Sequence, residues 1–356
     1  MRVLQLIDSL DPGGAEKMAV ALANELAAVD ETESFLCSSR KEGLFRDQIS
    51  GHVGYIHLAK RSTLDPRALW RLSRFISKNK IEVIHAHSSS FFYGFLMKTF
   101  HPSLRLIWHD HYGESEQLEA RDFGMLRRCS KSFDGIISVN ETLRKWASEH
   151  LKCADVSYLK NFVHVFPNNG TTRVQLEGNK KKIICLANFR PQKDHLTLLK
   201  AFKCFSERNS SWSLHLVGKD FNNSYSASIF DYLAKNQLSE VYYYGEQFDA
   251  HSLLQQADVG VLSSTSEGLP LALLEYGLSG LIVVASDVGA IAEVLSGSGR
   301  LFEAAQVDQL AMQFDWVENQ QETARMDAER FKEHVNSHYG FRSIQNQLFE
   351  TYIGES

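Results

Sequence analysis

The stretch from Val259 to Glu293, VGVLSSTSEGLPLALLEYGLSGLIVVASDVGAIAE, decides the fold of this chain. Its apolar runs, residues 259–262 and 281–285, predict buried strands, and a turn of small polar residues between them leads into a helix that begins at Pro270. A strand, a helix and a second strand in this order predict the βαβ unit of a parallel sheet. The helix start then lies at the carboxyl end of a strand, where open α/β sheets bind ligands.

Acidic residues and a helix start give this segment its chemistry. Glu267 lies in the loop before the helix, and Glu275 falls on the apolar side of the helix, where a carboxylate needs a polar partner. That partner is either the hydroxyl pair of a sugar or ribose, or backbone N–H groups of a neighbouring loop. The N–H groups at Gly268, Leu269 and Leu271 form an anion site at the helix N-terminus, which suits a phosphate.

The segment that carries these acids resembles a known family. Glu267 and Glu275, in EGLPLALLEYG, match the E-x7-E motif of retaining glycosyltransferases, and with DVGAIAE the segment is similar to the donor-nucleotide site of glycosyltransferase family 4. The resemblance implies an α/β protein of the GT-B fold, in which two Rossmann-like doubly wound domains face a cleft and a C-terminal helix crosses back to the first domain. It also implies that Glu275 holds the ribose and Glu267 the sugar hydroxyls of a nucleotide sugar.

The length of 356 residues is sufficient for two domains with separate cores. We expect an N-terminal, acceptor-side domain over residues 1–165 and a nucleotide-sugar-binding domain over residues 183–338. Residues 166–182 are polar, charged and glycine-bearing, which is typical of a linker. The resemblance implies that the last helix, within residues 339–356, packs back on the first domain.

A glycine loop follows the first predicted strand, Val3 to Ile7. Gly13 and Gly14 come before a helix, and glycines at such a place let a ligand lie close to the backbone. The resemblance puts this loop near the donor sugar, and the other interpretation is a tight turn without a ligand. The loop lacks the G-x-G-x-x-G pattern of dinucleotide sites, although Arg40 and Lys41 after the second strand would suit the 2′-phosphate of NADP.

Histidines follow two neighbouring strands of the first half. The run VIHA leads to His87, and His85 and His87 share one face of that strand because side chains alternate along it. The run LRLIW predicts the next strand, which delivers HDHYGE at its carboxyl end. The resemblance implies that a histidine at this strand end contacts the donor sugar. His111 fits that place best, His109 is the alternative, and His87 is a further candidate.

Two further features of this half are a group of possible metal ligands and a turn. Side chains that could bind a metal follow one another in HDHYGE: His109, Asp110, His111 and Glu114. No further ligand group stands at clear spacing and the chain has no D-x-D motif, so we expect no metal and no cofactor. Asn161, in LKNFV, resembles the N-G-V turn of the family and is a further candidate, with Phe162 where the family commonly has glycine.

Basic residues follow the first strand of the second half. Arg190 and Lys193 lie at a strand end and a helix start, where they can neutralise a diphosphate or can be two exposed charges. The family carries an arginine and a lysine here, but Asn188 takes the usual arginine position and Arg190 lies two residues later. With the helix N-terminus at Gly268, these side chains could replace a metal ion at the leaving group.

Composition limits the partners. The formal net charge of −5 gives no basic field for nucleic acid. The five cysteines are scattered without metal-ligand spacing, which favours reduced thiols in a cytoplasmic protein. No apolar run reaches the roughly 18 residues of a membrane span. The amphipathic helix at residues 65–80, DPRALWRLSRFISKNK, has a basic face with Trp70 that could rest on the inner membrane surface or simply be solvated.

Together these features favour a retaining glycosyltransferase. It would move a sugar from a nucleotide-diphosphate sugar, UDP rather than GDP, to a glycan or lipid-linked acceptor in the synthesis of cell-surface polysaccharide or lipopolysaccharide. The alternatives are an NADP-dependent oxidoreductase and a non-catalytic subunit that binds sugar nucleotides. Turnover separates the subunit from the enzyme, and binding of a nicotinamide cofactor would identify the oxidoreductase.

Overall fold

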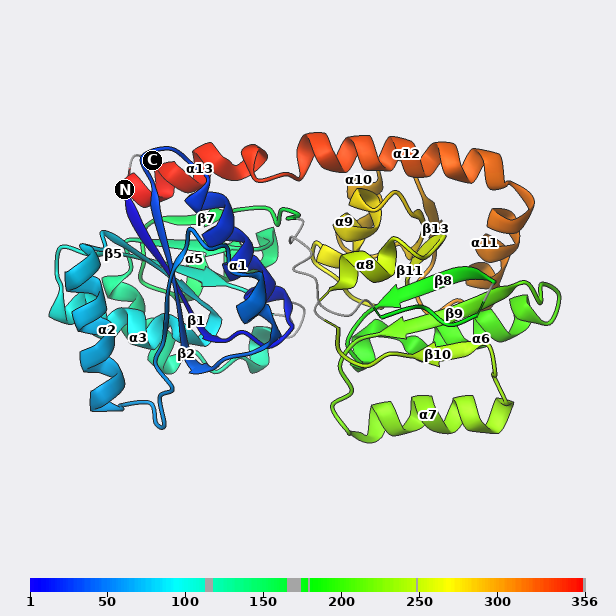
Figure 1. Cartoon of the computed structure of the whole chain (residues 1–356), viewed down its shortest axis with the longest axis horizontal. Helices are drawn as coiled ribbons and strands as arrows, with labels where there is room; N and C mark the ends of the chain where they lie inside the picture. The colour runs from blue at the N-terminus through cyan, green and yellow to red at the C-terminus, as the bar shows by residue number, and fades with distance from the viewer. Residues whose placement is uncertain (113–117, 165–173, 179, 248, 355–356) are drawn as a thin grey trace. The chain divides into compact units, whose positions relative to one another are not determined.

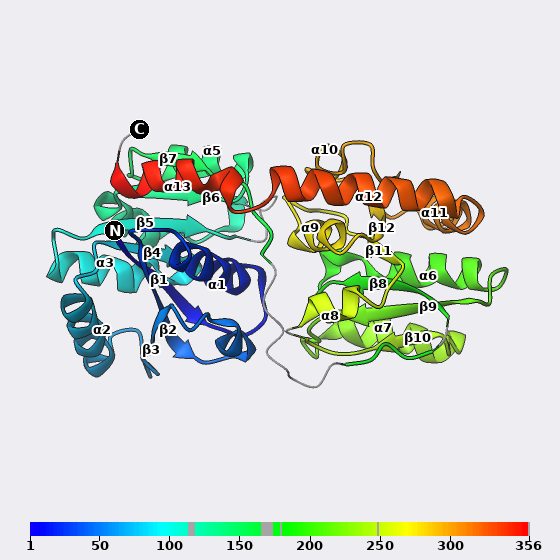
Figure 2. The same ribbon diagram turned by 45° about the horizontal axis from the view of Figure 1, so that its top comes forward.

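The computed structural model of the chain describes residues 1–112, 118–164, 174–178, 180–247 and 249–354. It divides into two compact units: unit 1 contains Met1–Asn169 and Phe341–Ser356, and unit 2 contains Gly170–Gly340. Each unit is a parallel sheet with helices on both faces (Figure 1 and Figure 2). The two Rossmann-like domains predicted from the sequence are confirmed.

Unit 1 is built on a seven-stranded sheet in the order β3-β2-β1-β4-β5-β6-β7, all parallel. Its strands are β1 (Arg2–Ser9), β2 (Glu33–Lys41), β3 (Gly54–His57), β4 (Val83–His87), β5 (Arg105–Asp110), β6 (Gly135–Ser138) and β7 (Val156–Tyr158). Its helices are α1 (Gly14–Ala27), α2 (Pro66–Asn79), α3 (Phe91–Phe100), α4 (Gly124–Cys129), α5 (Glu141–His150) and α13 (Arg342–Ile353).

Unit 2 is built on a six-stranded sheet in the order β10-β9-β8-β11-β12-β13, also parallel. Its strands are β8 (Lys181–Leu186), β9 (Trp212–Val217), β10 (Val241–Tyr243), β11 (Val259–Leu262), β12 (Ile282–Ser286) and β13 (Arg300–Phe302). Its helices are α6 (His195–Ser206), α7 (Ser224–Asn236), α8 (Ala250–Leu254), α9 (Leu271–Leu278), α10 (Ile291–Leu295), α11 (Val307–Asn319) and α12 (Gln321–His338).

Both sheets reverse their strand order once. The reversal lies between β1 and β4 in unit 1 and between β8 and β11 in unit 2. At such a switch point the connections leave in opposite directions, so the carboxyl ends of the two strands border a crevice that can take a ligand. The segment that decided the fold supplies β11, α9 and β12, and it therefore forms one side of the switch point of unit 2.

The strands of unit 1 have two different faces. Leu4 and Leu6 of β1 and Ile84 and Ala86 of β4 belong to the apolar core. Because side chains alternate along a strand, the opposite face carries Val3, Ile7 and Val83, and it also carries three buried polar residues. Those residues are Gln5, His85 and His87, and none of them is exposed to solvent.

The C-terminal helix α13 belongs to unit 1, whereas α12 belongs to unit 2. Arg105 donates from Nη2 to the carbonyl oxygen of Thr351 at 3.2 Å, and Gln347 donates from Nε2 to the carbonyl oxygen of Tyr158 at 2.7 Å. These bonds tie α13 to the ends of β5 and β7. The expectation that the last helix packs on the first domain is confirmed.

Three boundaries predicted from the sequence are wrong by a few residues. Lys181 and Lys182, which we expected in the linker, belong to β8, and the Lys181 ammonium pairs with Glu318 at 2.8 Å. Strand β5 continues through His109 and Asp110, because both pair in register with β6. Pro270 is the N-cap of α9 rather than its first helical residue, and its ψ of 123° is extended. Most of the predicted linker lies outside the described residues.

Candidate functional site

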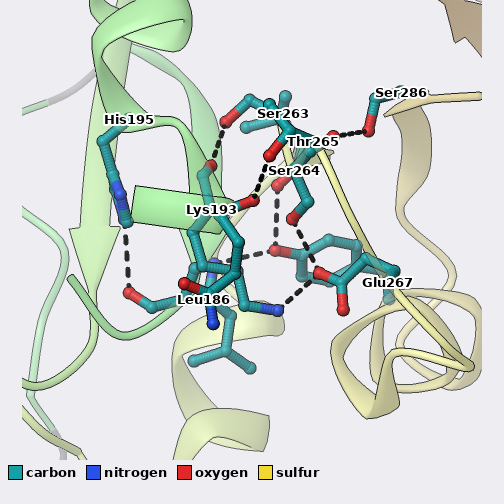
Figure 3. A network of polar contacts seen from close by, with 12 residues as sticks. Leu186, Lys193, His195, Ser263, Ser264, Thr265, Glu267 and Ser286 are labelled. Atoms are coloured by element: carbon teal, nitrogen blue, oxygen red, sulfur yellow. Dashed lines mark hydrogen bonds and ion pairs between the residues drawn. The ribbon is translucent and has the colours of Figure 1, made fainter. Parts of the chain in front are cut away.

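The switch point of unit 2 brings two of the predicted site residues together. Lys193 ends the short turn Pro191–Lys193 that follows β8, and Glu267 lies in the loop after β11. The Lys193 ammonium donates to Glu267 Oε1, and the Ser264 hydroxyl donates to the same oxygen at 2.6 Å (Figure 3). Only 9% of the Glu267 side chain and 24% of the Lys193 side chain is exposed. The site therefore holds a carboxylate, an ammonium and a hydroxyl within contact of one another.

Backbone contacts hold the loops that carry these side chains. The Thr265 N–H donates to the carbonyl oxygen of Gln192 at 2.8 Å, and the Ser263 hydroxyl donates to that of Lys193 at 2.9 Å. The Ser286 hydroxyl at the end of β12 donates to the carbonyl oxygen of Ser264 at 2.6 Å (Figure 3). The loops after β8 and β11 and the end of β12 are thus fixed to one another at the carboxyl edge of the sheet.

Asp194 turns the chain sharply after Lys193. Its φ of 45° is left-handed, a conformation that aspartate tolerates better than most residues. Its carboxylate caps α6 by accepting from the Thr197 N–H at 3.2 Å and from the Thr197 hydroxyl at 2.6 Å. This turn places Lys193 at the entrance of α6 with its side chain directed to Glu267.

Tyr276 of α9 was missed by the sequence analysis. Its buried hydroxyl accepts from the Leu186 N–H at 2.8 Å and donates to the carbonyl oxygen of Val261 at 3.2 Å. It therefore links β8 and β11 at the point where the sheet order reverses. A Cβ on Gly260 would lie 2.5 Å from the Tyr276 ring, so the glycine makes room for the aromatic side chain. The Y-G ending of EGLPLALLEYG was the available signal, because an aromatic residue on the buried side of α9 must reach the sheet.

Two other residues predicted at the donor site, Glu275 and Gly268, belong to α9 and to the loop before it. Glu275 is only half-buried, because the buried side of α9 is made by its neighbours Leu273, Leu274, Tyr276 and Gly277. It is therefore at the border of the apolar side rather than within it. The Gly268 carbonyl accepts from the Ala290 N–H at 3.1 Å, which fixes the start of α9 against the loop after β12.

The loop after β12 packs very closely on this part of the site. A Cβ on Gly289 would lie 2.0 Å from the carbonyl oxygen of Glu267, and Gly289 has a left-handed φ of 56°. Both facts require glycine at this position. The loop with the sequence DVGA therefore packs on the Glu267 loop and supports it.

Arg190 does not join the Lys193–Glu267 pair among the described contacts. Its exposed guanidinium lies over the ring of Phe221, 5.2 Å from the centroid. Asn188, at the position where the family commonly has arginine, accepts from the Lys219 N–H through Oδ1 at 2.8 Å. Asn188 thus fixes the loops after β8 and β9, and Lys193 is the cation that the structure places at the carboxylate.

At Gly13, in the glycine loop of unit 1, glycine is not required, because its φ of −169° is extended and its close neighbour is the flexible end of a side chain. A Cβ on Gly13 would lie 2.4 Å from Glu16 Oε2, because the Glu16 side chain folds back toward the loop. Gly14 is the first residue of α1, which places the N-terminus of this helix at the end of β1. Asn161 follows β7 and is half-buried, and its neighbour Phe162 packs on Phe341 with ring centroids 5.6 Å apart.

Four histidines lie together at the carboxyl ends of β4 and β5. His87 pairs in register with His109, so His85, His87, His109 and His111 share one face of the sheet. His85 Nε2 lies 3.1 Å from His109 Nδ1, and His87 Nδ1 lies 3.0 Å from His111 Nε2. Burial lowers the pKa of His85 and of His111 to about 3 and places the pKa of the other two well below its usual value. The cluster is therefore neutral at pH 7.

Three of these histidines can be tested as a metal site. One ring nitrogen from each of His85, His87 and His109 lies within 4.8 Å of the others. However, the rings of His85 and His87 are stacked, with centroids 4.6 Å apart and planes 8° from parallel. A metal ion lies in the plane of each imidazole that binds it, so two stacked rings do not direct their lone pairs at one ion. The arrangement favours a hydrogen-bonded array.

Asp110 is another side chain of HDHYGE that could bind a metal, and it pairs with an arginine instead. Asp110 is bound on both carboxylate oxygens by the Arg121 guanidinium, at 2.7 and 2.8 Å. Its charge is thereby neutralised within unit 1. Glu114 lies outside the described residues.

Comparison with known proteins gives the family. The model "Glycosyltransferase Family 4" matches residues 12–165, and the model "Glycosyl transferases group 1" matches residues 171–334. The putative glycosyltransferase EpsF of Bacillus subtilis (strain 168) is 34% identical over 103 residues, which are 29% of this chain and 26% of that protein. The chain therefore matches about a quarter of the length of this curated relative.

Solved structures share the fold over the whole chain. HepE of Anabaena in complex with UDP-glucose has a TM-score of 0.78 at 17% identity, covering 99% of this chain and 100% of that one. A glycosyltransferase from Rickettsia africae ESF-5 has a TM-score of 0.73 at 13% identity, covering 100% and 99%. WaaG, described as a glycosyltransferase involved in lipopolysaccharide biosynthesis, has a TM-score of 0.71 at 14% identity, covering 99% and 100%. The architecture is that of the GT-B class.

The two models together span most of both units. The chain belongs to the glycosyltransferases, with a family 4 N-terminal half and a group 1 C-terminal half. The residue-level resemblance stated from EGLPLALLEYG is thus confirmed at the level of the family. Within the part of the chain that the structure describes, no helix combines the length and apolar character needed to cross a bilayer.

Proposed function

We propose that this chain transfers a sugar, with retention of anomeric configuration, from a nucleotide-diphosphate sugar to a glycan or lipid-linked acceptor. The observation that carries the proposal is the contact of Lys193, Glu267 and Ser264 at the switch point of the group 1 unit. UDP is favoured over GDP because the HepE structures contain UDP or UDP-glucose. Cell-surface polysaccharide or lipopolysaccharide is the favoured product class, in line with the description of WaaG.

The chemistry requires a nucleoside diphosphate to leave. The bond between the anomeric carbon and the diphosphate oxygen breaks, the acceptor oxygen bonds to the same face of the sugar, and the acceptor proton passes to the departing phosphate oxygen. Lys193 supplies a fixed positive charge for the developing negative charge, assisted by Arg190 and by the N-terminus of α9 at Gly268, Leu269 and Leu271. No metal or cofactor is required in this scheme.

Hydroxyl groups of the donor need acceptors and donors of hydrogen bonds. Glu267 and Ser264 would bind hydroxyls of the transferred sugar, Glu275 would accept both ribose hydroxyls, and the backbone at Gly13 and Gly14 would lie close to the sugar. His111 would contact the sugar near the reacting carbon. Glu275→Ala should therefore weaken UDP binding, and a variant that binds UDP as tightly as the wild type would contradict the ribose assignment.

A donor panel tests the proposed reaction. UDP-, GDP- and ADP-sugars are compared by thermal stabilisation and by slow donor hydrolysis, with NADPH as the control. We expect one UDP-sugar to raise the melting temperature and to be hydrolysed. Stabilisation by NADPH alone would favour the oxidoreductase, and stabilisation by a nucleotide sugar without any turnover on added acceptors would favour the non-catalytic subunit.

We further propose that the protein acts in the cytoplasm at the inner membrane surface, through α2. Trp70 is 62% exposed on this helix, next to Arg67, Arg74 and Lys78, all exposed. The Arg74 guanidinium lies over the Trp70 ring at 5.4 Å from its centroid. An aromatic ring among basic side chains suits the headgroup region of an anionic bilayer, where a lipid-linked acceptor would be found.

A further inference from the structure

One buried amide connects the histidine cluster of unit 1. Gln5 of β1 has no exposed surface, and its two polar atoms bond to different partners. Gln5 Oε1 lies 2.8 Å from His87 Nε2, and Gln5 Nε2 donates to the Tyr352 hydroxyl of α13 at 3.3 Å. An amide oxygen can only accept, so the hydrogen in the first contact belongs to His87 Nε2.

The tautomer of His87 then sets that of His111. Because His87 is neutral and carries its hydrogen on Nε2, its Nδ1 has a lone pair. His111 Nε2 lies 3.0 Å from this lone pair and must supply the hydrogen of that contact. His111 is also neutral, since burial lowers its pKa to about 3, and its second nitrogen, Nδ1, is left without a hydrogen. Nδ1 makes no hydrogen bond with the described residues.

We propose that Gln5 and His87 are positioning residues that hold His111 with its hydrogen on Nε2, so that His111 Nδ1 accepts a hydrogen bond from a hydroxyl group of the transferred sugar. The second half of this statement rests on the proposed glycosyl transfer, whereas the tautomer does not. A ligand group that only accepts, such as a carboxylate or phosphate oxygen, finds no donor at Nδ1. The array therefore selects a hydroxyl and rejects an anion at this position.

A second branch of the array provides an internal control. Gln5 donates to Tyr352, so the Tyr352 hydroxyl hydrogen is available for His85 Nδ1 at 2.7 Å, and His85 Nε2 then donates to His109 Nδ1 at 3.1 Å. This branch ends at His109 Nε2, a buried atom with no hydrogen-bond partner among the described residues. It shares Gln5 with the first branch but makes no hydrogen bond to His111. Removing the Tyr352 hydroxyl should therefore leave the tautomer of His111 unchanged.

The tautomer is measured directly on the full chain. Two-bond proton–nitrogen correlation spectra of protein labelled with nitrogen-15 histidine separate ring nitrogens that carry a hydrogen from those that do not, and His111→Asn assigns the His111 signals. We expect Nε2 of His111 to carry the hydrogen in the wild type and in Tyr352→Phe. In Gln5→Leu we expect this preference for the Nε2–H tautomer to be lost. If Gln5→Leu fails to fold, Gln5→Glu replaces it. This variant keeps an oxygen that accepts from His87 Nε2, so His111 should keep its hydrogen on Nε2. A wild-type spectrum with hydrogen on Nδ1 overturns the proposal.

Kinetics test the contact with the sugar. We expect Gln5→Leu to lower kcat about tenfold, the effect of one lost hydrogen bond in the transition state, with no change in UDP affinity. His111→Asn, whose amide oxygen can replace Nδ1, should keep more activity than His111→Gln. Equal activity of these two variants would overturn the acceptor role of Nδ1. A chain that is inactive with every donor would instead count against the proposed function and leave the spectroscopic result standing.

Discussion

The two units have the same sheet topology but different chemistry at their switch points. Unit 2 places a charged pair there, the Lys193 ammonium on the Glu267 carboxylate. Unit 1 places uncharged imidazoles beside its switch point, of which His85 and His87 are fully buried. A diphosphate needs positive charge, and a sugar hydroxyl needs only a well-oriented neutral acceptor. The comparison shows how one fold can offer two kinds of ligand contact through the residues at the ends of its central strands.

The largest expected difference between the units is their response to acid. The folded chain keeps His85 neutral with a pKa of about 3, whereas the unfolded chain protonates it near 6.5. The unfolded state therefore binds more protons below pH 6.5, and stability is lost as the pH falls. Between pH 7 and pH 5 this amounts to about 2 kcal/mol for His85, and His87 and His109 act in the same direction.

Unit 2 contains fewer such histidines, His195 and His215, whose pKa burial lowers to about 4. We expect unit 1 to lose more stability than unit 2 on acidification. Hydrogen exchange followed by mass spectrometry on peptides of β4 and β8, at pH 7 and pH 5 in moderate urea, measures both units in one sample. Earlier loss of protection in β8 would reverse the comparison and remove the histidine array as the acid-sensitive part of the molecule.

The charged pair of unit 2 should dominate catalysis. Lys193→Met keeps most of the side-chain volume but removes the charge, and we expect kcat/KM for the donor sugar to fall by about 10²–10³. Binding of UDP should weaken, whereas binding of uridine, which has no phosphate, should not. Arg190→Met is the comparison variant and should lose less activity, because the Arg190 guanidinium lies over the Phe221 ring and only assists Lys193 in the proposed reaction. A larger loss in Arg190→Met than in Lys193→Met would move the phosphate site to Arg190.

Much of unit 2 could be predicted from local sequence. The strand, loop and helix pattern around EGLPLALLEYG gave β11, α9 and β12 and placed Glu267 at the carboxyl end of a strand. The same rule placed Lys193 at a strand end, but its contact with Glu267, from which 74 residues separate it, was not predicted. The position of Glu275 was less accurate, since a shift of a single residue along a helix, about 100° of rotation, decides whether a side chain faces the core or its border.

The polar array of unit 1 could not be predicted in the same way. The alternation of IHAH showed that His85 and His87 share a face, but Gln5 lies in an apolar run and gave no signal. Tyr352 is 267 residues from His85 and reaches it only because α13 packs on unit 1. Asp110, which we named among the side chains that could bind a metal while expecting none, is bound by Arg121, a contact that the sequence did not indicate. Contacts of this kind depend on tertiary packing, which short-range patterns do not encode.

Two buried tyrosine hydroxyls extend the comparison to stability. The Tyr276 hydroxyl of unit 2 bonds to the Leu186 N–H and the Val261 carbonyl, so Tyr276→Phe removes both hydrogen bonds and should lower the free energy of unfolding by about 1–3 kcal/mol. The Tyr93 hydroxyl of unit 1 is buried and has no partner among the described residues, so Tyr93→Phe should change stability little. Urea titration of both variants measures the difference. Equal losses would mean that ring packing, and not the hydroxyl, determines the effect.

The smallest expected effect concerns the exposed face of α2. Trp70→Ala should weaken binding to vesicles that contain anionic lipid several-fold, because about 1 kcal/mol or more is expected from an aromatic ring or a basic residue at the bilayer surface. Met312→Ala in unit 2 is the control, since Met312 is also apolar and 67% exposed but lies on α11. Sedimentation with vesicles with and without anionic lipid separates charge from apolar contact. If Met312→Ala weakens binding as much as Trp70→Ala does, α2 has no special role, and membrane contact does not distinguish unit 1 from unit 2.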